Sequence, residues 1–497
     1  MSEDKEKKDL PPVSTEPWVP LPSHQWTEPE RWAWERIRTG QPADFNERYG
    51  NELDPKNEAL WTEEEKKRRG LRADFLYTVL LNHPWQLIIK NTPVIIIGAW
   101  FDGQLNMPAA RVENFLGLGV CRIDHGIIFN SVFFTHGLKI LSCRVGALAN
   151  LGRIKTPANL SLKGSLIRSL KLIGAEIGGE LNMDKVTFEK NLEMDGAFIA
   201  GGLFLKWGNF KVARLHGIQV NGQFTMKKAT FDGPLIMEKI NVKGSLHMRK
   251  AIFKKEVNLA LANIEGHIAF EGAKFQILNL ASTNVEGFAD GITRNNSQGA
   301  WPDKLNLDHF TYKHIRGIPG RHDSQDLTDR PASWFVSWLA KHKPYSPQPY
   351  QQCAKVLREA GQPWKAAEVL FAGKERERKN SIWYRWLWLW FFKWSVGYGL
   401  GIRFRILPAF WALCLLVAGY FVFWHIPETS KYSGWWAWGY SLNRLLPIVN
   451  LHPGFAEIKH FGLWPGAWFV FQTLCGWVLA ALIAAGLAGV GKPGGRD

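Results

Sequence analysis

The chain has 497 residues, of which 46% are hydrophobic and 25 are tryptophan, and its formal net charge is +16 at pH 7. This charge favours anionic partners such as phospholipid head groups, nucleic acid or acidic proteins, although lysine and arginine beside membrane helices account for much of it. The five cysteines form no CxxC pair and no zinc-type spacing, which excludes a disulfide-rich scaffold and a zinc finger and fits a reducing compartment.

The N-terminal segment is charged and rich in proline. It has little apolar surface to bury, so we expect a disordered tail over residues 1–30. The tail lacks the apolar stretch of a signal peptide, which predicts that the soluble part stays in the cytoplasm. Residues 31–91 are predicted to form a helical N-terminal cap. Its amphipathic helix over residues 60–81 would cover the unpaired strand edge of the repeats that follow.

A unit of about 22 residues recurs across residues 92–316. Each unit contains apolar pairs at i and i+2, most clearly a small residue followed by a bulky one. The bulky positions lie 22, 22, 21, 22, 22, 21, 22 and 22 residues apart. They are Phe101, Ile123, Val145, Leu166, Phe188, Phe210, Phe231, Phe253 and Phe275. A second feature with this period is the series Gly179, Gly201, Gly222, Gly244 and Gly266.

This spacing predicts short extended segments, because alternate residues of a strand face the same side. Four segments per unit predict a coil with four walls, and ten coils stacked about 4.8 Å apart would form a rod roughly 50 Å long. A helix would need apolar residues at i, i+3 and i+4 instead. The phenylalanines expected to point into the coil interior are Phe188, Phe210, Phe231, Phe253 and Phe275.

The repeat resembles that of the pentapeptide-repeat family, whose signature is alanine, aspartate or asparagine, leucine and two variable residues. The resemblance covers residues 92–316 and implies a mainly β fold, a right-handed quadrilateral β-helix with a slightly longer coil of about 22 residues. Outward lysines such as Lys250 argue against DNA mimicry by an acidic rod, and we predict no specific nucleic-acid partner. Cys121 and Cys143 share a wall position in adjacent coils, which suits two buried core residues or a disulfide.

The C-terminal part changes to a helical period. Residues 330–380 predict a hairpin connector that resembles a single tetratricopeptide-like pair, and the tryptophan-rich residues 381–405 are typical of a membrane interface. Residues 406–490 are predicted to contain two transmembrane helices, at 406–424 and 464–490. Basic residues precede the first span and follow the second, so we expect a multi-pass protein of the bacterial inner membrane with its N- and C-termini in the cytoplasm.

Residues 434–451 are apolar but too few to cross, which predicts a re-entrant or interfacial segment. Two spans with such a segment between them resemble the core of simple tetrameric cation channels, but the filter-like Gly397-Tyr398-Gly399 precedes the first span. The candidate pore or interface residues are Asn443, Arg444 and Pro447. In one interpretation Arg444 snorkels to lipid phosphates. In the other, Asn443 and Arg444 line a water-filled vestibule where Pro447 ends the helix.

The whole layout resembles a bacterial group that combines a repeat rod, a hairpin ending in KERERK, a GYG segment and a YSLxxxLPIVxL segment between two spans. Its members are often identified as membrane-associated oxidoreductases. The residues themselves do not support this activity. The chain has no CxxC, HExxH, GxSxG or Walker loop, and its GYGLGI segment lacks the full GxGxxG and follows no predicted strand. We expect no catalytic, cofactor-binding or metal site, no cofactor and no enzymatic activity.

Three functions stay open at the level of sequence. The first is a non-enzymatic membrane-anchored scaffold or sensor that presents the rod to a cytosolic protein. The second is an oligomeric channel-like or pore-forming effector, built from copies of this chain, with stress or phage defence as a variant. The third and weakest is the membrane-associated oxidoreductase. The lipid bilayer is a partner in all three.

Overall fold

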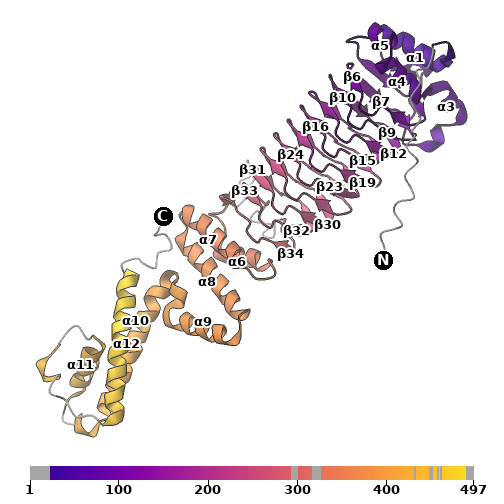
Figure 1. The fold of residues 1–497 in the computed structure, drawn as a ribbon. Coiled ribbons are helices and arrows are strands. Elements are labelled where there is room, and N and C mark those ends of the chain that lie inside the picture. Colours follow the sequence, from indigo (N-terminus) through magenta and orange to yellow (C-terminus); the bar gives the residue numbers. More distant parts are fainter. Residues whose placement is uncertain are drawn as a thin grey trace. The chain divides into compact units, whose positions relative to one another are not determined.

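The computed structural model divides the chain into two compact units, Met1–Ile292 with Asn296–Asp303, and Thr293–Asn295 with Lys304–Asp497. The first contains the N-terminal cap and the repeats, and the second contains most of the helical region (Figure 1). The residues described by the structure are 23–292, 300–315, 326–429, 432–446, 451–455, 458 and 462–487.

The repeats form a parallel β-solenoid of about nine turns with about 22 residues per turn, which confirms the predicted β-helix of stacked short repeats. Strands of successive turns pair in parallel and make two sheets. One sheet contains β1 (Ala43–Asp44), β3 (Val94–Ile97), β6 (Arg111–Val112), β7 (Leu116–Gly119), β10 (Phe133–Phe134), β11 (Leu138–Leu141), β13 (Lys155–Thr156), β14 (Leu160–Ser161), β16 (Glu176–Ile177), β17 (Leu181–Asn182), β20 (Phe198–Ile199), β21 (Leu203–Phe204), β24 (Gln219–Val220), β25 (Phe224–Thr225), β28 (Asn241–Val242), β29 (Leu246–His247), β31 (Asn263–Ala269) and β33 (Asn284–Ala289). The other contains β2 (Gly70–Arg72), β4 (Trp100–Asp102), β5 (Leu105–Asn106), β8 (Arg122–Ile123), β9 (Ile127–Ile128), β12 (Arg144–Asn150), β15 (Leu166–Lys171), β18 (Thr187–Phe188), β19 (Asn191–Glu193), β22 (Asn209–Phe210), β23 (Val212–Arg214), β26 (Thr230–Phe231), β27 (Leu235–Ile236), β30 (Ile252–Asn258) and β32 (Lys274–Asn279).

The sequence period sets the register between turns. Phe231 pairs with Phe210 on one side and with Phe253 on the other, and Phe253 pairs in turn with Phe275. The rings from Phe210 to Phe275 stack with centroid separations of 4.6, 5.2 and 4.8 Å. Phe188 lies in the same row and is buried with Phe210, Phe231 and Phe253, whereas Phe275 is partly exposed.

Two backbone features recur along the solenoid. Between Ala109 and Ser282 a left-handed residue follows every 10 or 11 positions, with φ between +52° and +73°. At a different position in each turn, glycines of successive turns stack on one another. They lie so close that a Cβ at Gly222 would be 2.7 Å from the Gly201 carbonyl oxygen. In the interior, Cys121 and Cys143 are buried free thiols in adjacent turns, with the Cys121 amide nitrogen 3.3 Å from the Cys143 sulfur.

The cap consists of short helices that add two strands to the first turn, because β1 pairs with β3 and β2 pairs with β4. The single helix predicted over residues 60–81 is wrong: β2 interrupts it, since the strand edge of the first turn needs backbone partners. The first long helix begins at Glu28, ahead of the predicted boundary at residue 31. The helices are α1 (Glu28–Arg38), α2 (Phe45–Tyr49), α3 (Glu63–Arg69), α4 (Ala73–Leu81) and α5 (Trp85–Ile88).

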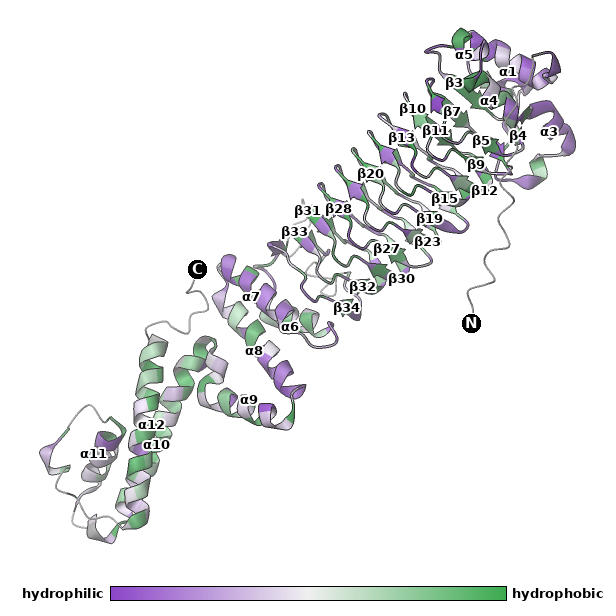
Figure 2. Cartoon of the chain, in the orientation of Figure 1, coloured by the Kyte–Doolittle hydropathy of each residue, from purple (hydrophilic) through white to green (hydrophobic). Residues whose placement is uncertain are grey.

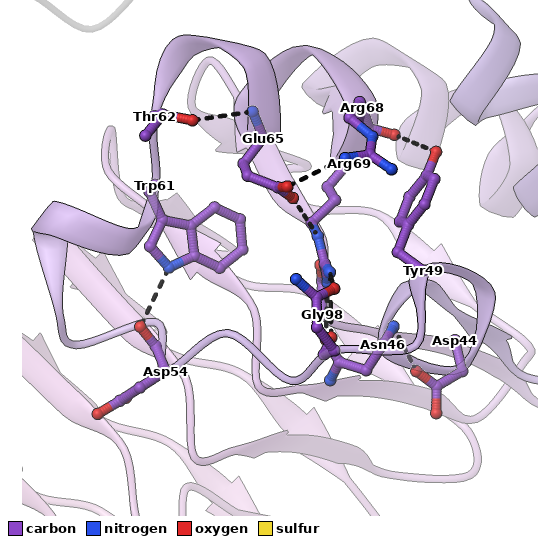
Figure 3. Close-up of polar contacts among 11 residues, drawn as sticks. Asp44, Asn46, Tyr49, Asp54, Trp61, Thr62, Glu65, Arg68, Arg69 and Gly98 are labelled. Atoms are coloured by element: carbon purple, nitrogen blue, oxygen red, sulfur yellow. Dashed lines mark hydrogen bonds and ion pairs between the residues drawn. The ribbon is translucent and has the colours of Figure 1, made fainter.

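A buried arginine joins the parts of the cap. The Arg69 side chain is fully buried, and its guanidinium donates to Glu65 Oε2 at 3.0 Å, to Asn46 Oδ1 at 2.7 Å and to the Asn51 carbonyl at 3.1 Å (Figure 3). A buried charge is stable only when it is paired and hydrogen-bonded, and these partners supply both. We interpret Arg69 as a structural residue that closes the solenoid at this end.

The second unit begins with β34 (Lys304–Asn306) and β35 (His314–Ile315) and then becomes helical. Helices α7 and α8 pack together as a hairpin, and α11 contacts both α10 and α12. Both α10 and Leu463–Ala485 of α12 are long and apolar enough to cross a membrane (Figure 2). The helices are α6 (Ala332–Ala340), α7 (Gln348–Glu359), α8 (Pro363–Lys379), α9 (Trp383–Val396), α10 (Gly401–Trp424), α11 (Gly434–Leu445) and α12 (Leu463–Leu487), with the short 3-10 turn η3 (Gly397–Gly399) before α10.

Candidate functional site

The short helix α11 lies along the second half of α10. At its start, Gly434 is next to Tyr420 and Trp424, in the last turns of α10. One turn before its end, the Ser441 hydroxyl donates a 2.8 Å hydrogen bond to the Leu416 carbonyl. The start of α11 thus contacts the end of α10, and the end of α11 contacts the middle of α10. The two helices therefore run antiparallel.

The other side of α11 packs on α12 through polar groups and glycine. Ser441 and Gln472 are fully buried, and the Gln472 side-chain amide donates to the Ser441 hydroxyl at 2.9 Å and to its carbonyl at 3.1 Å. Gly419 of α10 makes room for both, since a Cβ there would lie 2.3 Å from the Ser441 oxygen. The Leu445 carbonyl sits over Gly476, where a Cβ would lie 2.1 Å away. The C-terminal end of α11 thus lies beside the middle of α12.

An aromatic cluster fixes the orientation of α11. Tyr440 is fully buried, and its ring lies 5.0 Å from the Phe469 ring of α12 and 5.1 Å from the Phe423 ring of α10. Phe455, from the short 3-10 turn η5 (Pro453–Phe455), closes the cluster. Because Tyr440 contacts all three segments, its hydroxyl is held in one place.

Two of the three predicted site residues lie together at the end of α11. The Arg444 Nε and Nη2 atoms donate to the Tyr440 hydroxyl at 3.0 and 2.8 Å, and the guanidinium carbon lies 5.0 Å from the ring centre. The Asn443 side-chain oxygen accepts a hydrogen bond from the Leu451 amide at 2.9 Å and so joins the helix to Leu451. Pro447, the third predicted residue, lies outside the described residues.

A second polar cluster connects the hairpin to the start of α10. Glu375 of α8 accepts hydrogen bonds from Tyr398 in η3 at 2.6 Å, from Lys393 of α9 at 3.0 Å and from Arg378 at 3.1 Å. Burial by itself raises the pKa of Glu375, but these three donors outweigh it and lower the pKa to about 2. Burial and the bond to Glu375 raise the pKa of the Tyr398 hydroxyl. Both groups therefore keep one protonation state at neutral pH.

The tryptophan-rich helix α9 has only two charged residues, and α8 neutralises both. Lys393 pairs with Glu375, and Arg385 pairs with Glu377 at 2.5 Å. The rest of the surface of α9 is largely aromatic, and these side chains stay exposed in the folded chain. Its exposed large apolar residues are Trp383, Tyr384, Trp386, Leu387, Trp388, Trp390, Phe391, Phe392 and Trp394.

Sequence reasoning missed the groups that hold α11 in place. Ser441, Gly419 and Gly476 are unremarkable in apolar helices, but Gln472 is a polar amide inside an apolar segment, and that signal was available. Within the described residues, no three His, Cys, Asp or Glu side chains gather as a metal site would require. No family model, no curated protein and no solved structure matches this chain, so the proposals below rest on its own geometry.

Proposed function

We propose that this protein is an oligomeric membrane pore whose conducting path passes the C-terminal end of the re-entrant helix α11. In this proposal α10 and α12 cross the bilayer, since 24 and 25 helical residues reach about 36 Å and the hydrocarbon core is about 30 Å thick. With 12 residues, α11 reaches only about 18 Å and cannot cross.

The observation that carries the proposal is the level at which α11 ends. Leu416 lies eight residues before the end of α10, and Gln472 lies nine residues after the start of α12. At 1.5 Å per residue, Ser441 is then about 12–14 Å inside the helix ends, and Leu445, which contacts Gly476, is about 20 Å inside. These distances favour a re-entrant helix that stops near the middle of the bilayer over an interfacial one.

A helix that stops at this depth leaves its last carbonyl groups without helical partners. Irregular backbone inside a membrane is tolerated only where it is buried in protein or lines a water-filled cavity. Large apolar residues of α10 and α12, such as Phe410 and Leu474, are exposed in one chain and are available to lipid or to neighbouring copies. Several copies around a common axis would enclose the ends of their α11 helices, and this arrangement is the proposed pore.

The proposed orientation puts the solenoid in the cytoplasm of a bacterial cell, attached to the inner membrane. The aromatic surface of α9 suits the cytoplasmic interface, and the basic residues before α10 suit the same side. In the finer detail of this proposal, the solenoid is a right-handed, four-walled coil of the pentapeptide-repeat type. The turn length of about 22 residues and the small-bulky pairing support that assignment.

Single-channel recording tests the pore. The full-length protein, purified and reconstituted in planar bilayers, is expected to conduct in discrete steps. Gly476→Val should abolish current, because a Cβ at Gly476 would lie 2.1 Å from the Leu445 carbonyl oxygen and displace α11. A Cβ at Gly466 of the same helix meets nothing within 4 Å, so Gly466→Val should leave current intact. Absence of current from the wild-type protein in every lipid mixture overturns the proposal.

A second candidate is a non-conducting membrane scaffold that presents the solenoid to a cytosolic protein. The connection of α9 to the hairpin favours it, since ion pairs at Glu375 and Glu377 would hold the hairpin at a fixed place on the membrane. It is the function that remains if the wild-type protein anchors in membranes and passes no current.

A further inference from the structure

The charge of α11 is concentrated in one side chain. Arg444 is its only charged residue, and a guanidinium stays protonated at any physiological pH. A charge near membrane mid-depth is costly and persists where it meets water, a partner or an ion. Within the described part of the chain, its polar partner is the neutral Tyr440 hydroxyl and no carboxylate is in ion-pair contact.

The contact with Tyr440 holds the guanidinium without neutralising it. Helical side chains tilt toward the N-terminus, which brings Arg444 back over the preceding turn and onto the hydroxyl of Tyr440. Among the described residues, two of its five N–H groups bond to that hydroxyl, and three are left for another acceptor. Tyr440 is itself fixed by Phe423 and Phe469, so the cation is preorganised rather than mobile.

We propose that Arg444 makes the pore selective for small inorganic anions. This inference rests on the proposed pore: copies of α11 around one axis would place one preorganised guanidinium per subunit beside the water path. Rings of arginine attract anions and repel cations, and planar N–H donors suit halides and oxyanions alike. The opposing interpretation is that Arg444 only offsets the negative end of the α11 dipole, an effect of the helix terminus that requires no permeating ion.

Reversal potentials under a tenfold KCl gradient separate these interpretations. The reconstituted wild-type protein is expected to reverse near the chloride equilibrium potential. Arg444→Lys should keep anion preference, Arg444→Gln should weaken it, and Arg444→Glu should lower the chloride-to-potassium permeability ratio by about tenfold or more. Tyr440→Phe should also weaken it, because the guanidinium loses its hydroxyl partner.

A chemical variant avoids dependence on the folding of Arg444→Glu. In a background without the five native cysteines, Arg444→Cys is assembled in the bilayer and then modified with a cationic or an anionic thiol reagent. Restored anion preference with the cationic reagent alone supports the inference. The inference is overturned if the wild-type pore conducts but prefers potassium, or if the Arg444→Cys pore has the same selectivity after either reagent. Neither result contradicts the pore itself. Absence of current overturns both.

Discussion

At the scale of single residues, the solenoid depends on backbone positions that a side chain cannot share. The glycines at one bend of each turn approach the neighbouring turn so closely that a Cβ at Gly222 would lie 2.7 Å from the Gly201 carbonyl oxygen. The left-handed residues at the half-turns are different, because many of them carry side chains. At those positions the cost is conformational, about 1–2 kcal/mol for a residue other than glycine.

The two kinds of glycine should respond differently to the same added methyl group. Gly222→Ala forces the backbone of adjacent turns apart. We expect this overpacking to lower the free energy of unfolding by about 1–3 kcal/mol or more. At Gly196, φ is +64° and an added Cβ meets nothing within 4 Å. Gly196→Ala should therefore lower the free energy of unfolding less, by the cost of a left-handed backbone alone. Thermal melts of the full chain in detergent, followed by β-sheet circular dichroism, measure both. Equal losses would mean that the close stacking at Gly222 is not a constraint.

The sequence predicted the interior of the solenoid better than its corners. The 21- and 22-residue spacings anticipated which phenylalanines face each other across turns, because i, i+2 pairing follows directly from strand geometry. The left-handed half-turn positions were not predictable. They are occupied by residues as different as Lys228, Trp207 and Leu261, and none of these types marks a positive φ.

At the scale of elements, Glu375 connects the hairpin of α7 and α8 to α9 and to η3, which precedes α10. Its three donors come from α8, α9 and η3, so one carboxylate joins three segments of the chain. Such charge-assisted hydrogen bonds are worth about 1.5–3 kcal/mol each when partly buried. A motion of the hairpin would therefore pass to η3 and the start of α10.

Reversing the charge at this position should loosen α9. Glu375→Lys is expected to raise hydrogen exchange at α9 amides by about tenfold or more, because like charges then face Lys393 and Arg378. The double variant Glu375→Lys with Lys393→Glu should recover part of the protection. Glu359→Lys, which breaks an exposed pair with Lys355 at 3.9 Å, is the control and should change nothing in α9. Equal exchange in all variants would contradict the connecting role.

The low pKa of Glu375 predicts that mild acid leaves the attachment of α9 to α8 unchanged. The pKa of Glu375 is about 2, below its ordinary value of 4.5, so its contribution is complete above about pH 4.5 and is lost as pH falls through about 2. Exchange at α9, corrected for the intrinsic rate, should be equal at about pH 7.5 and 5.5. A marked rise at pH 5.5 would show that another titrating group holds α9.

Element boundaries were partly accessible from sequence. The apolar segment at 434–451 was expected to be re-entrant or interfacial, and α11 occupies Gly434–Leu445 of it. The contacts of α11 could not be predicted from the sequence, because Leu416, Ser441 and Gln472 come together only through the packing of three helices. The break between α3 and α4 was missed for a similar reason: β2 forms because the first turn offers it an edge, while its local sequence is compatible with a helix.

At the scale of the whole molecule, the proposed pore requires a particular membrane topology. If α10 and α12 both cross, the solenoid and the C-terminus are on the same side, and only the region around residues 425–463 faces the other. Reporter fusions after Leu307 and after Asp497 should both report cytoplasm, and a tag inserted beside Thr429 should be reached from the periplasm. A periplasmic signal from either fusion contradicts the topology and, with it, the proposed entry side of α11.

The proposed pore requires that α11 ends at a water-filled site inside the bilayer. Cysteine accessibility tests it most directly, in a protein freed of native cysteines and exposed to a membrane-impermeant charged thiol reagent. Arg444→Cys is predicted to react rapidly. Leu474→Cys, exposed in the single chain and near the same level of α12, is predicted to stay unmodified because it faces lipid or a neighbouring copy. Absence of reaction at Arg444→Cys, or equal reaction at both positions, would contradict the account.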